Sequence, residues 1–102
     1  MIALVESKRD RLAELCRRFH VQRLELFGSA CAPGFDPVRS DLDFLVEFQG
    51  VPEGQHANCY FGLLEALELM FGRPVDLVEV KALDNPYFLA AIERLREVLY
   101  AA

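Results

Sequence analysis

Apolar residues occupy every second position over residues 41–48, with Leu45 as the one apolar residue on the other face, and this pattern predicts a β-strand. Its apolar set faces one side and consists of Leu42, Phe44, Val46 and Phe48. The other side begins with two carboxylates, Asp41 and Asp43. Residues 23–27 and 75–80 have shorter patterns of the same kind and predict two more strands. We therefore expect a sheet with one face in the core and one face available for polar chemistry.

Apolar residues at helical spacing predict three helices. The first stripe, which ends near His20, is Leu4, Val5, Leu12, Leu15, Cys16 and Phe19. The second, which ends at the capping residue Gly72, is Tyr60, Leu63, Leu64, Leu67 and Met70. The third, in a terminal helix opened by Asn85 and Pro86, is Phe88, Leu89, Ile92, Leu95 and Leu99. The expected fold class is α+β, with a small mixed sheet of three to four strands flanked by helices.

Composition limits the kind of protein. With 102 residues, 53% of them hydrophobic, the sequence predicts one domain over residues 1–102. Charged residues near the N-terminus interrupt its apolar run, so we expect no signal or membrane segment and a cytoplasmic location. The formal charge of −5 argues against stable nucleic-acid binding and suits a basic partner protein. Three widely spaced cysteines are expected to be reduced and structural.

Three acids predict a cation site. Asp41 and Asp43 share one face of their strand about 6–7 Å apart, and Asp76 lies in the next predicted strand. Alone, each is an ordinary strand or turn residue, but together each pair at about 5 Å costs on the order of 3 kcal/mol. A bound cation or raised pKa values would relieve that repulsion, and Mg²⁺ prefers such ligands. Gly28 and Ser29, at the end of the first strand, suit the approach of a phosphate.

These motifs resemble a known family. The segments Leu26-Phe27-Gly28-Ser29, 40–48 with its acid pair, and 75–79 around Asp76 are similar to the minimal nucleotidyltransferases, small relatives of the DNA polymerase β superfamily. Segments 85–87 and 98–102 look like that group too, so that the resemblance covers nearly the whole chain.

The resemblance implies a polymerase β-like nucleotidyltransferase fold and a set of site residues. Asp41 and Asp43 would bind two magnesium ions, while Asp76 would bind the catalytic ion and help to deprotonate the acceptor. Gly28 and Ser29 would hold the triphosphate of ATP. The implied reaction is attack of an acceptor hydroxyl on the α-phosphorus, with release of pyrophosphate.

One departure from the family concerns the phosphate loop. Relatives often carry a glycine and an arginine where this chain has Pro33 and Gly34. Arg39 is the expected substitute for binding phosphate, with Arg73 as a second candidate, although an arginine held only by solvent is the simpler interpretation of each.

Many members of the family are antitoxins of HEPN-domain ribonuclease toxins, and some transfer AMP to a tyrosine of the toxin. The first hypothesis is therefore a magnesium-dependent enzyme that adenylylates a partner HEPN toxin. The alternative is a non-catalytic antitoxin that neutralises its partner by surface contact. A third possibility, an antibiotic-modifying transferase subunit, would need a larger cleft. A homodimer is possible, but no repeated apolar pattern in the sequence requires one.

Overall fold

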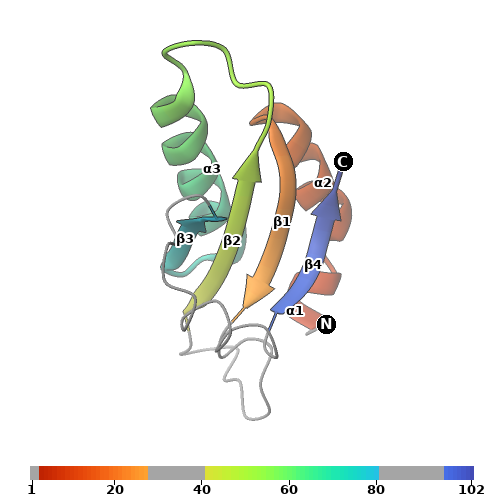
Figure 1. The fold of residues 1–102 in the computed structure, drawn as a ribbon. Coiled ribbons are helices and arrows are strands. Elements are labelled where there is room, and N and C mark those ends of the chain that lie inside the picture. Colours follow the sequence, from red (N-terminus) through yellow and green to blue (C-terminus); the bar gives the residue numbers. More distant parts are fainter. Residues whose placement is uncertain (1–2, 28–40, 81–95) are drawn as a thin grey trace, which may run out of the picture.

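A four-stranded sheet with helices on one face organises the protein (Figure 1). The computed structural model describes residues 3–27, 41–80 and 96–102. The elements in chain order are α1 (Ala3–Glu6), α2 (Arg9–Arg18), β1 (Val21–Phe27), β2 (Leu42–Phe48), α3 (His56–Phe71), β3 (Val75–Glu79) and β4 (Arg96–Ala101). None of the helices in these ranges is long and apolar enough to cross a membrane.

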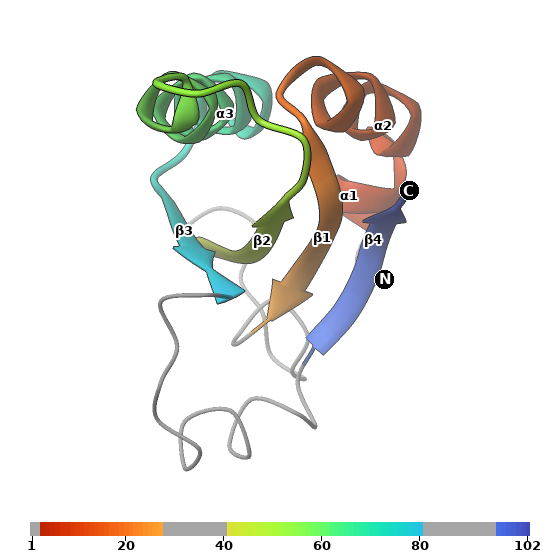
Figure 2. The ribbon, with the colours of Figure 1, turned by 45° about the horizontal axis from the view of Figure 1, so that its top comes forward.

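The strand order is β3-β2-β1-β4. Strand β1 is antiparallel to both β2 and β4, whereas β2 and β3 are parallel and connected through α3. Helices α2 and α3 lie side by side over the same face of the sheet (Figure 2). Within the described residues no helix covers the opposite face, which we call the open face of the sheet (Figure 2). This arrangement confirms the predicted α+β class with a small mixed sheet.

The main core lies between the sheet and the helices. Its fully buried side chains include Leu12 of α2, Leu63 and Leu67 of α3, and Phe44 of β2. On the open face a smaller apolar cluster joins Phe27 and Leu45, with Val78 and Val80 packed against it. The alternation of β2 therefore separates core residues from open-face residues as the sequence predicts.

Two leucines of α3 test this division. Leu63 is fully buried and Leu69 is 78% exposed. We expect Leu63→Ala to lower the free energy of unfolding by about 2–5 kcal/mol, because it leaves a cavity under the sheet. Leu69→Ala in the same helix should change it by less than about 0.5 kcal/mol. Urea denaturation of both variants measures the difference, and equal losses would contradict this packing.

Two predicted elements were wrong in part. The apolar residues of the N-terminal stripe belong to two helices, because Ser7 and Lys8 form a turn that interrupts the helix between α1 and α2. Leu99 does not extend a terminal helix: it lies in strand β4, where a β-bulge opposite β1 leaves it buried in the core. The rest of the predicted terminal helix, residues 85–95, lies outside the described residues. The end of α2 beside His20 and the left-handed cap at Gly72 agree with the sequence.

Candidate active site

Asp43 and Asp76 form the centre of the candidate site. Asp43 of β2 and Asp76 of β3 are register partners in parallel strands, so both side chains stand on the open face. Their neighbours Phe44 and Leu77 point to the core instead. The strand alternation and the parallel register together bring these two predicted acids side by side.

The two carboxyl groups are close enough to share a proton. The pKa of Asp43 is raised from its ordinary value of 3.8 to about 6, first by partial burial, then by the hydrogen bond and charge of Asp76, and finally by the charge of Asp41. A carboxylate pair of this kind is relieved either by a shared proton or by a bound cation. The donor set is all oxygen, which suits Mg²⁺.

Asp41 stands slightly apart from this pair. It is exposed and precedes the first residue of β2, and its charge raises the pKa of Asp43 less than Asp76 does. Across residues 3–27, 41–80 and 96–102, the structure contains no group of three His, Cys, Asp or Glu side chains arranged to hold a metal ion. The geometry therefore brings together two of the three predicted acids, Asp43 and Asp76, whereas the third, Asp41, is two residues before Asp43 and immediately precedes β2.

The predicted phosphate-binding residues Gly28, Ser29 and Arg39 lie outside the described residues. Strand β1 nevertheless ends at Phe27, whose register partner on β2 is Asp43. The chain thus leaves the sheet toward Gly28 from a position beside the acid pair. Arg73, the other candidate for phosphate, precedes β3, and its Nε donates to the Phe71 carbonyl at 3.4 Å.

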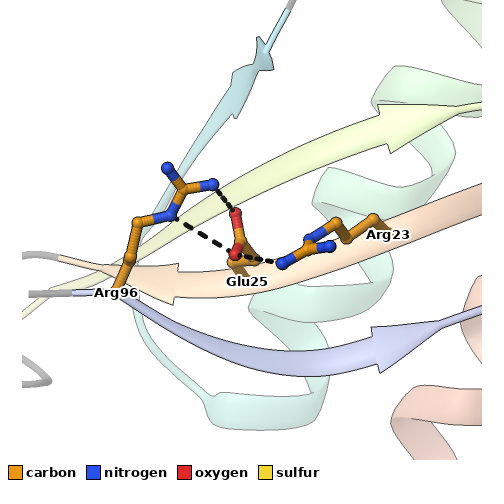
Figure 3. Close-up of polar contacts among 3 residues, drawn as sticks. All are labelled: Arg23, Glu25 and Arg96. Carbon is orange, nitrogen blue, oxygen red and sulfur yellow. Dashed lines mark hydrogen bonds and ion pairs between the residues drawn. The ribbon is translucent and has the colours of Figure 1, made fainter. Parts of the chain in front are cut away.

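The structure adds an ion-pair cluster that sequence reasoning missed. Glu25 is only 2% exposed, and its carboxylate accepts hydrogen bonds from Arg23 and Arg96 (Figure 3). The Nε of Arg96 lies 3.3 Å from Glu25 Oε1, its second contact goes to Oε2, and Arg23 donates to Oε1 at 3.2 Å. One signal was available: Glu25 is a carboxylate between two leucines, with an arginine two positions earlier on the same face of the strand.

Other polar groups lie toward the far end of β2. The Nε2 of His56 is 2.7 Å from Glu79, and both line a pocket of about 410 Å³ with residues 46–54. The hydroxyl of Tyr60 donates to the Leu77 carbonyl, and burial, followed by the charges of Glu79 and Asp76, raises the Tyr60 pKa. Because Glu47 is four residues beyond Asp43 on β2, about 13 Å along the strand, it lies away from the acid pair.

Two of the three cysteines behave as the sequence predicts. Cys16 and Cys59 are free and buried, and burial raises the pKa of the Cys16 thiol to about 12. Cys31 lies outside the described residues.

The profile of the Nucleotidyltransferase domain family matches residues 9–99 of the chain. The chain belongs to this family. A protein of Methanocaldococcus jannaschii named as a protein adenylyltransferase is 37% identical over 78 residues, which are 74% of this chain and 74% of that protein. A second protein of the same name and organism is 35% identical over 79 residues, 78% of this chain and 76% of its own length. The enzyme class of this nucleotidyltransferase is thus a transferase, as predicted.

Solved structures show the same fold. One described as a minimal nucleotidyltransferase has a TM-score of 0.72 and 31% identity, and covers 91% of this chain and 90% of its own. Another solved structure is a complex between a tri-AMPylated Shewanella oneidensis HEPN toxin and an MNT antitoxin. The matching chain has a TM-score of 0.63 and 18% identity, and the match covers 96% of this chain and 73% of that one. A toxin–antitoxin structure with AMP-PNP has a TM-score of 0.64 at 18% identity, and covers 92% and 73%. At such identity the last two similarities concern the fold alone.

Proposed function

We propose that this nucleotidyltransferase transfers AMP from ATP to a hydroxyl group of a partner protein, at the open face of the sheet beside Asp43 and Asp76. The observation that carries the proposal is the pairing of these two carboxylates in adjacent strands, with the charge of Asp41 added to theirs. The names of the two relatives support protein as the acceptor class.

The reaction is an in-line displacement at phosphorus. The acceptor oxygen forms a bond to the α-phosphorus as the bond from that phosphorus to the bridging oxygen of the β-phosphate breaks, and pyrophosphate leaves with those electrons. The acceptor proton passes to a carboxylate, for which we propose Asp76 because it is the more exposed member of the pair. Gly28, Ser29 and Arg39 are proposed to hold the phosphates.

The acid pair fits a divalent cation. Two adjacent carboxylates, Asp43 and Asp76, of which the second raises the pKa of the first, offer oxygen ligands at the point where a phosphate would approach. We propose that Asp43 and Asp76 hold Mg²⁺ together, and that Asp41 contributes to a second ion. When bound, magnesium would neutralise charge on the phosphates and on the attacking oxygen. The protein residues fix the position of the acceptor and receive its proton.

The proposed partner is a HEPN-family toxin, and the proposed acceptor is a tyrosine. Two observations favour this class of partner: the fold is shared with chains of toxin–antitoxin complexes, one of which contains an AMPylated toxin, and the acidic surface suits a basic protein. In this system the chain would act as the antitoxin in the cytoplasm.

The position of a radioactive label tests the chemistry. The full chain is incubated with magnesium and its co-purifying partner, in one reaction with ATP labelled at the α-phosphate and in another with ATP labelled at the γ-phosphate. We expect the α-label alone to reach the partner, and the intact mass of the partner to increase by one or more AMP groups. Label from the γ-phosphate would indicate a kinase and contradict the proposal, as would no label at all.

The alternative is neutralisation by contact without transfer. The only observation that favours it is the acidic character of the chain. An experiment with the same partner protein distinguishes neutralisation by contact from neutralisation by AMP transfer. If Asp43→Asn neutralises the partner as fully as the wild-type chain, contact is sufficient; if neutralisation fails while the complex still forms, transfer is required.

A further inference from the structure

The ion-pair cluster of Arg23, Glu25 and Arg96 lies on the same face of the sheet as the acid pair. Register partners point to the same side of a sheet, and Arg96, Phe27, Asp43 and Asp76 form one continuous row across β4, β1, β2 and β3. The guanidinium of Arg96 and the acid pair therefore occupy two ends of one row, separated by Phe27. Two strand spacings put the backbones of Arg96 and Asp43 about 10 Å apart.

Glu25 holds Arg96 in a fixed direction. The side chain of Glu25 is only 3% exposed. Its carboxylate accepts hydrogen bonds from both the Nε and one terminal nitrogen of Arg96 (Figure 3). A buried ion pair of this kind is a poor source of stability, because apolar residues of similar volume serve a fold as well. The two-point contact with Glu25 instead fixes the orientation of the Arg96 guanidinium.

The cluster brings two guanidinium groups to one buried carboxylate. Arg23 and Arg96 both contact Glu25 on the open face, and Arg96 lies two strands away from Asp43 in the row. The sequence has no Lys or Arg from Gly28 through Val38, the segment that follows β1. Arg39, proposed above for phosphate, is the first cation of the chain after β1, and Arg96 would supply a second cation at the end of the row beyond Phe27.

Resting on the proposed function, we propose that Arg96, oriented by Glu25, binds the β- and γ-phosphates of the nucleotide and the departing pyrophosphate. Arg96 is the phosphate contact, and Glu25 is a positioning residue that acts through it. The long side chain of an arginine and the length of a polyphosphate together span the separation between this cluster and the acid pair. The planar fork of arginine suits phosphate oxygens.

Arg23 provides a matched control. It also contacts Glu25, but its register partners are Glu47 and Ala101, at the opposite end of the open face from the acid pair. A purely structural cluster would respond similarly to loss of either arginine. A phosphate site would respond to Arg96 alone.

The test is calorimetric titration of the full chain with magnesium pyrophosphate and with magnesium AMP, for wild type, Arg96→Gln and Arg23→Gln. We expect Arg96→Gln to weaken pyrophosphate binding about ten-fold or more and Arg23→Gln to weaken it less than two-fold. AMP, which lacks the β- and γ-phosphates, should bind equally to all three. Unchanged pyrophosphate affinity in Arg96→Gln, or equal losses in both variants, overturns the inference.

Two further variants keep the test decisive. Arg96→Lys retains the charge without the fork, so that if Arg96→Gln does not fold by circular dichroism, Arg96→Lys should still show a loss of several-fold in pyrophosphate affinity, and no loss overturns the inference. Glu25→Gln should weaken pyrophosphate binding in the wild-type background but add nothing to Arg96→Gln, because it acts through Arg96. Fully additive losses would contradict the positioning role. If wild type binds neither magnesium ATP nor magnesium pyrophosphate, the proposed function itself fails.

Discussion

Replacing either Asp43 or Asp76 by asparagine is expected to lower the rate of AMP transfer by about 10³-fold or more. Asparagine keeps the size of the side chain but removes the negative charge that draws the cation to the pair and, at Asp76, the base that receives the acceptor proton. Because both acids serve one centre, the double variant should be little slower than either single one. The measurement is the initial rate of α-label transfer from ATP to the partner.

Glu47→Gln is the matched control for these variants. Glu47 lies on the same strand and the same face as Asp43, but its register partner on β1 is Arg23, away from Asp76. Its loss should change the rate by no more than about two-fold. A thousand-fold loss in Glu47→Gln, or near-normal transfer by Asp43→Asn, would place the chemistry elsewhere on the sheet.

The contribution of Asp43 to the stability of the metal-free chain should fall as pH rises. The folded-state pKa of Asp43 is about 6, above its ordinary value of 3.8, so between these values the folded state binds more protons than the unfolded one. The stabilisation is fully present below about pH 3.8 and is lost as pH rises through about 6. Allowing for solvent screening of this half-exposed group, we expect about 1 kcal/mol, or about 4–8 °C in Tm.

Thermal denaturation in EDTA at pH 5.0 and pH 7.5 measures this effect. Wild type should melt at a higher temperature at pH 5.0, after subtraction of the change seen in Asp43→Asn, which has no carboxyl group to titrate at this position. Adding magnesium should raise the Tm of wild type at pH 7.5 and leave that of Asp43→Asn nearly unchanged. A wild-type Tm that rises with pH relative to the variant would have the opposite sign and contradict the paired-acid geometry.

Local alternation was sufficient to predict the faces of the sheet. In β2 every second residue is apolar, so the sequence alone separates Phe44 in the core from Asp43 on the open face. Asp76 has the same relation to Leu77 in β3. The pairing of the two acids could therefore be anticipated once the strands were placed next to each other.

Contacts between distant parts of the chain could not be predicted in this way. Leu99 continues the helical spacing of the apolar residues before it, yet it lies in β4 because β1 offers that segment a pairing edge more than 70 residues away in the sequence. The Glu25–Arg96 ion pair depends on the same long-range pairing and was missed for the same reason. The break between α1 and α2 is a local feature that the regular apolar stripe concealed.

The shared cation is tested most directly by titrating Mn²⁺ into the wild-type chain, Asp43→Asn, Asp76→Asn and the double variant, with binding followed by electron paramagnetic resonance. If the two carboxylates hold one ion together, either single substitution should weaken Mn²⁺ binding about as much as both together. Wild-type affinity in either single variant, or losses that simply add in the double variant, would show that the two acids do not form a common site.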